Sequence, residues 1–226
     1  MKKIIPLLFI LQVLFCSVIA AQEKYGNFES IVIDTPFPVE ISIGSESFVD
    51  LAAVKDLVND IKISQRGGTL FIIVKKTFSP QMNFQNRIIK ISTKTLNSIL
   101  NRGAGSLTVA SPVKTNSLIV NNQASGAISI TAELDQFTAN ISGSGSIKIS
   151  GRSNQANIRI TGSGQFLGKG FTVKKSDISI SSSGSVTFEA SETISARLSA
   201  SGSVIYTGTG RVINQKITAS GRIVKQ

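Results

Sequence analysis

Basic residues at a fixed spacing are the feature of this sequence that points most directly to binding chemistry. Arg159, Arg197 and Lys216 each stand five residues before a glycine that recurs along the chain. If the recurring segments stack as strands, outward side chains in one register follow one another about every 4.8 Å. These residues would then form a basic stripe able to bind an acidic glycan or a lipopolysaccharide phosphate. The remaining predicted ligand-binding residues are Lys148 and Arg152, with Lys169 nearby. The alternative is that the charge only keeps the protein in solution.

The residue types that most enzymes use are scarce. The chain has no histidine and a single cysteine, Cys16, near its N-terminus. This composition excludes Ser-His-Asp and Cys-His catalysis, histidine metal sites and, in a chain cleaved after its N-terminal segment, zinc-thiolate sites. A GxSxG elbow, a phosphate-binding loop, a GxGxxG motif and the calcium-binding GGxGxD repeat are all missing from the sequence. The sequence therefore predicts no cofactor and no metal.

Carboxylates are the remaining candidates for catalysis, since a polysaccharide lyase or hydrolase needs them clustered on one face. From residue 103 onward the acidic residues number five: Glu133, Asp135, Asp177, Glu189 and Glu192. The two close pairs, Glu133 with Asp135 and Glu189 with Glu192, are expected to be solvated charges in or near corner loops. A non-enzymatic protein is therefore predicted, with a polysaccharide-active enzyme as the alternative.

The elements that would position these residues repeat along the chain. Seven similar segments, such as GSGSI at 143–147 and ASGSV at 200–204, share a central glycine. These ruler glycines are Gly105, Gly126, Gly145, Gly164, Gly184, Gly202 and Gly221. The gaps between them are 21, 19, 19, 20, 18 and 19 residues. A period of this length is typical of stacked repeats, each of which buries its apolar face against its neighbours.

Within each repeat, apolar and polar residues alternate. The residue two after the ruler glycine is always large and apolar, the residue two before it is always small, and serine usually stands directly before it. A period of two is strand spacing, and glycine in a strand pattern marks a bend or a close backbone contact. The pattern predicts an all-β fold, a right-handed parallel β-helix with coils of about 19 residues. The fixed register disfavours hairpins of a β-sandwich, and the lack of a six-residue period disfavours a left-handed hexapeptide helix.

Two repeats carry asparagine where the others carry isoleucine or leucine, four residues before the ruler glycine. Asn101 and Asn122 could stack in the interior and hydrogen-bond along the helix axis, as amides do in cross-β ladders. The alternative is that both lie at a less buried end of the stack. The sequence favours this second interpretation.

Residues 1–21 have the features of a secretory signal peptide. A basic start precedes an apolar run over 4–19, which is shorter than the roughly 20 residues of a membrane-spanning helix, and two alanines follow. The sequence predicts export through the Sec pathway to the periplasm, the outer surface or the medium, with no transmembrane segment in the mature chain. Lipidation at Cys16 is disfavoured, because Phe15 stands where a lipoprotein signal requires a small residue.

The mature chain is predicted to be a single β-helix domain over 22–226. Within it, 101–226 holds the seven regular repeats, whereas 25–100 lacks the glycine ruler but is rich in strand-like segments. Because a solenoid must cover its end layer, residues 25–100 are expected to form irregular first coils and an N-terminal cap. A separate small β domain is the alternative. The other elements predicted here are one helical turn over 55–60 and a protruding loop over 79–86.

The repeated segments SGSGSI and ITGSG, on coils of this length behind a signal peptide, resemble the putative auto-transporter adhesin, head GIN domain family. The resemblance covers about residues 25–226. It implies a fold similar to the pectin-lyase-like β-helices and a role in cell adhesion, in a family common in Bacteroidetes. It supplies no catalytic residues. Members often have aspartate directly after the ruler glycine, and this chain has none there, so no cation site is carried over.

Net charge and export together define the expected partners. Without Lys2 and Lys3 the chain has 22 basic and 13 acidic residues, a net charge of about +9. A basic surface attracts acidic polymers, but an exported chain with few aromatic side chains to stack on bases is not expected to bind nucleic acid. The predicted function is adhesion, or binding of cell-surface or envelope glycans. A purely structural envelope protein and end-to-end homo-oligomers remain open alternatives.

Overall fold

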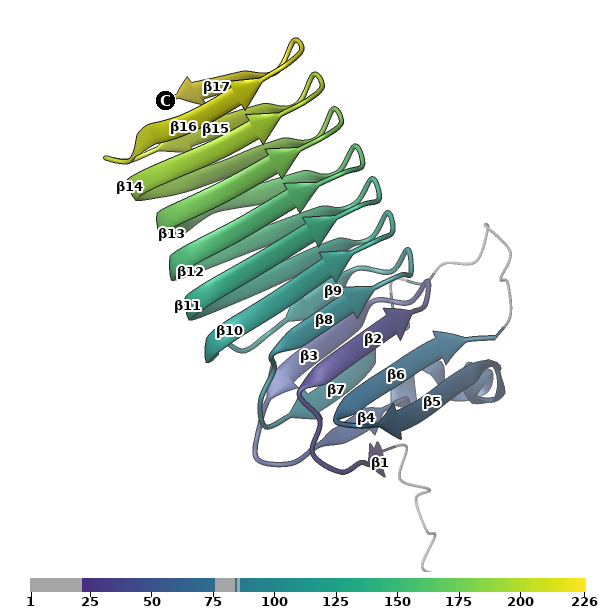
Figure 1. Ribbon diagram of the computed structural model, residues 1–226. Coiled ribbons are helices and arrows are strands. Elements are labelled where there is room, and N and C mark those ends of the chain that lie inside the picture. Colours follow the sequence, from purple (N-terminus) through teal and green to yellow (C-terminus); the bar gives the residue numbers. More distant parts are fainter. Residues whose placement is uncertain (1–21, 76–83, 85) are drawn as a thin grey trace, which may run out of the picture.

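The computed structural model describes residues 22–75, 84 and 86–226, and Figure 1 shows them as one long stack of strands. The parallel strands form a β-solenoid of about 7 turns, spaced about 19 residues apart. The coils wind right-handed around a flattened core (Figure 1). The predicted fold class is therefore confirmed. The predicted signal peptide, and most of the predicted loop over 79–86, lie outside the described residues.

Each regular coil is one long strand bent around the core. The strands of the regular coils are β10 (Val113–Asn122), β11 (Ala127–Ile141), β12 (Ser146–Ile160), β13 (Gln165–Ile180) and β14 (Ser185–Leu198). In β11 to β14 the first half lies in the back wall of Figure 1 and the second half in the front wall. Alternate residues are buried, as the period of two predicts, and the alternation shifts phase where the strand bends. The tight turns that contain the ruler glycines form the opposite edge of the stack (Figure 1).

The ruler glycines are required because successive turns touch. A Cβ atom added to Gly145 would lie 2.3 Å from the carbonyl oxygen of Gly126 in the preceding coil. The contact recurs one coil later, where a Cβ on Gly164 would lie 2.4 Å from the carbonyl oxygen of Gly145. No side chain fits at such distances, so glycine at these positions is the condition for the coils to stack this closely.

Apolar ladders and aromatic rings fill the interior. The ladder two residues after the ruler glycine includes Ile128, Ile147, Phe166 and Val186, which stack in register and are all buried. Phe171 lies in register with Gly151, so a large side chain occupies the space beside a residue without one. Its ring lies 5.5 Å from that of Phe137 at an interplanar angle of 73°, an edge-to-face contact that aromatic pairs favour.

Asn101 and Asn122 are fully buried, so the interpretation that places them at a less buried end is wrong. Asn101 Nδ2 donates to Asn122 Oδ1 over 3.2 Å. Asn122 Nδ2 in turn donates to the carbonyl oxygens of Gly126 (2.7 Å) and Ser146 (3.2 Å). The two amides therefore form a buried ladder along the axis, and their burial is compensated by hydrogen bonds.

The first coil of the chain lies between two coils that come later in the sequence. The strands concerned are β2 (Ser30–Asp34), β3 (Val39–Ile43), β6 (Thr69–Val74), β7 (Ile89–Thr93), β8 (Ser98–Asn101) and β9 (Leu107–Val109). β2 pairs in parallel with both β6 and β8, and β3 pairs in parallel with both β7 and β9. The coils therefore stack in the order β6–β7, β2–β3, β8–β9. The sequence did not predict this order.

An irregular cap covers the N-terminal end. It consists of β1 (Gln22–Lys24), β4 (Phe48–Asp50), the 3₁₀ helix η1 (Ala52–Asp60) and β5 (Ile61–Arg66). β5 pairs antiparallel with β6, and β4 pairs antiparallel with β7. Helix η1 is longer than the predicted turn. Within it, Asp56 accepts hydrogen bonds on both carboxylate oxygens from the Arg87 guanidinium, and this contact lowers the pKa of Asp56.

In the ranges that the structure describes, no helix has the length and apolarity to cross a membrane.

The C-terminal rung carries polar residues at inward positions. It is built from β16 (Arg211–Ile217) and β17 (Arg222–Lys225), which stack on β14 and β15 (Ser203–Thr207). Gln215 lies in register with buried Ala196, and Lys225 lies in register with Tyr206, with its Nζ 6.0 Å from the ring centroid. A further strand added here would bury an amide and a charge. Inward charges of this kind protect sheet edges from pairing.

Apolar residues at these two positions are therefore expected to promote end-to-end association. The variant Gln215→Val/Lys225→Ile should show a molar mass that rises with concentration in sedimentation or light scattering, while the unchanged protein shows a smaller rise. Lys216→Ile, which adds an apolar side chain at the outward register of this rung, serves as the control. Equal behaviour of all three proteins would contradict a protective role of the inward residues.

Candidate binding surface

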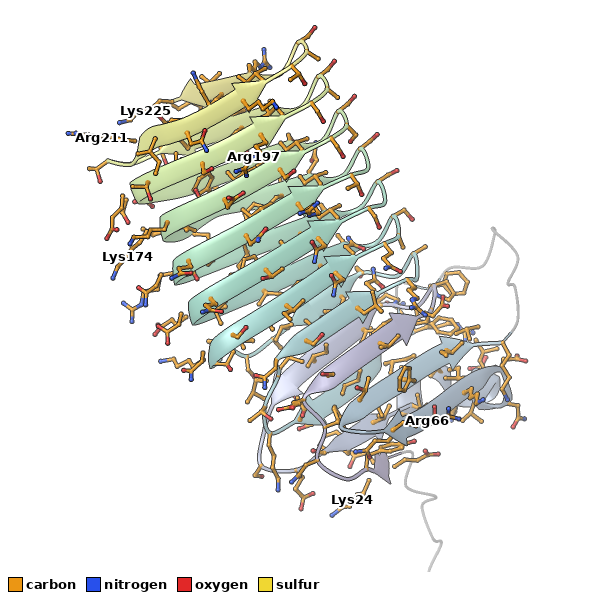
Figure 2. The ribbon with its side chains drawn as sticks, in the orientation of Figure 1. Lys24, Arg66, Lys174, Arg197, Arg211 and Lys225 are labelled. Atoms are coloured by element: carbon orange, nitrogen blue, oxygen red, sulfur yellow. The ribbon has the colours of Figure 1, made fainter. Side chains whose placement is uncertain are left out.

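A row of basic residues lies on the front wall. Arg159, Ser179, Arg197 and Lys216 occupy one outward register on successive strands, and we call these four residues the basic row. Figure 2 shows Arg197 on this wall. The structure therefore brings together three of the five residues that the sequence assigned to a binding stripe, through the register that the ruler glycines set.

Two cations of the basic row are unpaired. Arg197 Nη1 lies 3.2 Å from the carboxylate of Asp177, which faces outward in the preceding coil two residues before Ser179. Arg159 and Lys216 are exposed, and neither takes part in an ion pair within the described part of the chain. They lie three rungs apart, which corresponds to roughly 14 Å along the axis. An anionic group of a ligand can approach either one without displacing a protein carboxylate.

The same register changes character toward the N-terminal end. Next to Arg159 come Asn140 and Asn121, joined by a hydrogen bond of 2.8 Å from Asn140 Nδ2 to Asn121 Oδ1. Beyond them the register holds partly exposed apolar side chains, namely Leu100, Val32 and Phe71. Along this outward register of the front wall, from the C-terminal to the N-terminal end of the stack, the side chains thus change from basic to amide to apolar.

Lys148 and Arg152 lie outside the basic row. Lys148 is on the first half of β12, in register with Ser129 and Leu167, and so faces out from the back wall. Arg152 stands near the corner, where it is in register with Glu133. Both residues precede the bend of the strand, whereas Arg159 follows it. Lys169 lies in an irregular part of β13, also before the bend.

The corner itself carries two consecutive outward residues in each coil, because the inward and outward alternation must shift once as the chain turns around the core. We call the following residues the corner ridge: Asp135, Gln136, Asn154, Gln155, Lys174 and Lys175. Figure 2 shows Lys174 at the left edge of the stack. Sequence reasoning missed the ridge. The signal for it is a pair of adjacent polar residues that interrupts the alternation once in each repeat.

A groove of about 960 Å³ follows one side of the ridge, and we call it the corner groove. Its charged and amide lining residues are Lys114, Asn116, Glu133, Asp135, Arg152, Asn154 and Lys174. Its depth has two causes in the sequence. Gly151, at a positive φ of 109°, contributes no side chain to the floor. Ser153 occupies an inward position that Leu134 and Val173 hold in the coils on either side.

The charged groups of the corner groove hold one another in place. Arg152 Nη2 donates to Glu133 Oε2 over 2.9 Å, and Lys114 Nζ lies 3.8 Å from the same oxygen. Asn154 Nδ2 donates to Asp135 Oδ1 over 2.7 Å. Glu133 and Asp135 lie near the corner but within strand β11, where Asp135 is exposed and Glu133 is partly exposed. Among the described residues, no three His, Cys, Asp or Glu side chains are grouped so that they could hold a metal ion.

A second, smaller groove of about 430 Å³ lies on the front-wall side of the ridge. Its polar lining residues are Gln136, Thr138, Gln155, Asn157, Lys175, Ser176, Asp177 and Ser195. The surface is hollowed here because the inward register that holds Phe137 holds the small residues Ala156 and Ser176 in the next two coils. Polar grooves thus flank the corner on both sides.

Comparison with solved structures supports the fold. A putative adhesin from Bacteroides fragilis is 21% identical and superposes with a TM-score of 0.83, covering 91% of this chain and 95% of the other. A putative adhesin from Parabacteroides distasonis is 20% identical, with a TM-score of 0.69 and the same coverage. A putative lipid binding protein from the same organism is 22% identical, with a TM-score of 0.68 and again the same coverage. No curated protein matches the chain.

The sequence also matches a family model. The model describes a putative auto-transporter adhesin, head GIN domain, and it matches residues 27–210. The matched range includes the β2–β3 coil, the regular coils, the corner groove and most of the basic row, so the resemblance noted from the repeated segments is confirmed. This chain belongs to the putative auto-transporter adhesin, head GIN domain family.

Proposed function

We propose that this protein is an exported, non-enzymatic adhesin module that binds acidic glycans on a cell surface or in the envelope. The observation that carries the proposal is the basic row, in which Arg159 and Lys216 present unpaired cations along the stack axis. Membership of an adhesin family supports a binding role. Export through the Sec pathway rests on the predicted signal peptide over 1–21, and the destination is the periplasm, the outer surface or the medium.

A stack of this kind suits a repetitive ligand. Outward side chains of one register repeat about every 4.8 Å, so an extended polymer can meet the same chemistry rung after rung. Individually exposed ion pairs contribute little, about 0.2–1 kcal/mol each, but a polymer collects several of them. Binding of this type weakens as salt screens the charges.

The arrangement of the carboxylates favours binding over catalysis. A glycosidase of the common type needs one carboxyl group to act as acid and another to act as nucleophile or base. Glu133 is held by Arg152 and Lys114, and Asp135 accepts from Asn154. Each carboxylate is thus engaged by a neighbour on the next coil. Turnover of an acidic polysaccharide by the purified protein would overturn the non-enzymatic proposal.

Replacing the three cations of the basic row tests the proposed function. The variant Arg159→Ala/Arg197→Ala/Lys216→Ala is expected to lower the affinity for an acidic polysaccharide about tenfold at low salt, with the difference shrinking at high salt. Surface plasmon resonance on an array of acidic and neutral glycans measures this. The control Lys55→Ala/Lys62→Ala/Lys90→Ala removes the same charge from exposed positions in and near the cap. An equal loss in both variants would refute a specific role for the row.

A lipid amphiphile is a second candidate ligand. The front-wall register ends in partly exposed Leu100, Val32 and Phe71, and one similar structure is described as a putative lipid binding protein. A lipopolysaccharide-like molecule could place acyl chains on these residues and phosphates on the basic row. Binding to anionic vesicles that Leu100→Ser/Val32→Ser weakens, together with no binding on the glycan array, would replace the glycan by the lipid.

A further inference from the structure

We propose that the corner groove is the site that recognises sugar rings. In it an oligosaccharide that carries both hydroxyl and carboxylate groups lies along the stack axis. This inference rests on the proposed glycan binding and adds a second surface to it. The basic row attracts any polyanion, whereas the corner groove distinguishes a carbohydrate from other polyanions.

The size and direction of the groove fit an extended oligosaccharide. Its volume of about 960 Å³ is at the upper end of the range typical of small-molecule sites, about 300–1,000 Å³. Its lining comes from the successive strands β10 to β14, from Lys114 on β10 to Ser191 on β14. Because the strands stack along the axis, successive units of a ligand in the groove contact side chains of successive strands.

The groove offers donors and acceptors side by side. Lys114, Arg152 and Lys174 can only donate hydrogen bonds, while ionised Glu133 and Asp135 can only accept them. A sugar hydroxyl both donates and accepts, so it can satisfy a donor and an acceptor on neighbouring rungs. A polyanion without hydroxyl groups cannot donate to Glu133 or Asp135, and these carboxylates repel it. The lining is therefore matched to a hydroxyl-rich ligand.

The remaining charge favours an acidic sugar over a neutral one. Three cations and two carboxylates line the groove. The Glu133 carboxylate engages Arg152 and lies near Lys114. Lys174 is exposed and makes no ion pair within the described ranges. The Lys174 ammonium group is thus available for a ligand carboxylate.

The polar groups of the groove are arranged before any ligand arrives. Glu133 orients Arg152 over 2.9 Å, and Asp135 orients the Asn154 amide over 2.7 Å. Groups already held in one geometry lose little conformational freedom on binding, which favours affinity. Since the Asn154 nitrogen donates to Asp135, its carbonyl oxygen remains as an acceptor. Asn116, exposed on the preceding side of the groove, supplies another amide.

A charge-neutral variant isolates the sugar contacts. Asn116→Ala/Asn154→Ala removes two groove amides without altering net charge or the basic row. The probes are a panel of defined hexasaccharides that alternate uronic acids with N-acetylated amino sugars, and linear polyphosphate as a polyanion without hydroxyls. We expect the variant to bind at least one hexasaccharide about tenfold more weakly, since two hydrogen bonds are lost. Its affinity for polyphosphate should be unchanged. Asn121→Ala/Asn140→Ala, which removes two amides from the front wall, is the matched control and should retain hexasaccharide affinity.

The outcomes separate the two proposals. Hexasaccharide binding that is insensitive to Asn116→Ala/Asn154→Ala, or equally sensitive to the control, would overturn the corner groove as the sugar site and leave the basic row as the glycan surface. Binding of polyphosphate but of no hexasaccharide would also overturn it. Failure of all these probes to bind would remove the proposed function together with this inference. Weaker hexasaccharide binding with unchanged polyphosphate binding supports it.

Discussion

Replacing Gly145 with alanine is expected to destabilise the protein by about 3 kcal/mol or more. The new Cβ would lie 2.3 Å from the carbonyl oxygen of Gly126 and 2.6 Å from that of Ala124. Both atoms are backbone, so no side chain can move aside. The coils on either side must separate, which breaks their ladder of hydrogen bonds. Urea unfolding followed by circular dichroism measures the loss.

Gly170→Ala is the matched control for this prediction. Gly170 is also a glycine of the regular coils, but a Cβ added there would have no atom within 4 Å. Its φ of 83° makes alanine unfavourable by about 1–2 kcal/mol. If Gly145→Ala costs no more than Gly170→Ala, the close approach of the coils does not explain the glycine ruler.

Replacing Asn122 with isoleucine alone is expected to destabilise the protein by about 1–3 kcal/mol, because Asn101 Nδ2 loses its acceptor in a fully buried site. Replacing both asparagines with isoleucine should recover most of that loss. The same inward register already holds Ile141, Ile160 and Ile180 in the following coils, so the side chain fits the stack.

A double-mutant cycle separates the pair from its surroundings. The free energy of unfolding of Asn101→Ile, of Asn122→Ile and of the double variant gives the coupling energy between the two amides. Strictly additive effects would show that the 3.2 Å hydrogen bond contributes nothing beyond the burial of each residue. In that case the asparagines would be only poor substitutes for isoleucine.

Local periodicity made most of the fold predictable. Alternation at a period of two identified strands, and the spacing of Gly126, Gly145 and Gly164 identified coils, because each glycine contacts the coil before it. The burial of Asn101 was not predictable in this way. An amide is disfavoured in an interior unless a partner is present, and that partner, Asn122, is one full coil away in the sequence.

The candidate site was predictable only where a register is fixed by a nearby glycine. Arg159, Arg197 and Lys216 lie a constant five residues before the ruler, and the structure aligns them. Lys148 and Arg152 precede the bend of the strand, where the phase shift at the corner separates them from the row. The corner groove depends on the small inward Ser153 and on pairings across five coils, which no local pattern reveals.

The first coil, formed by β2 and β3, lies between two coils that come later in the sequence, and this limits the order in which the protein can fold. Strands β2 and β3 each pair on both edges with strands that are made later, the last of which ends at Val109. A chain that leaves the ribosome N-terminus first therefore exposes two open edges until about half its length has emerged. From that point each new coil can pair with the coil that precedes it in the sequence. The first half of the protein must assemble as a unit, and the second half can then follow one turn at a time.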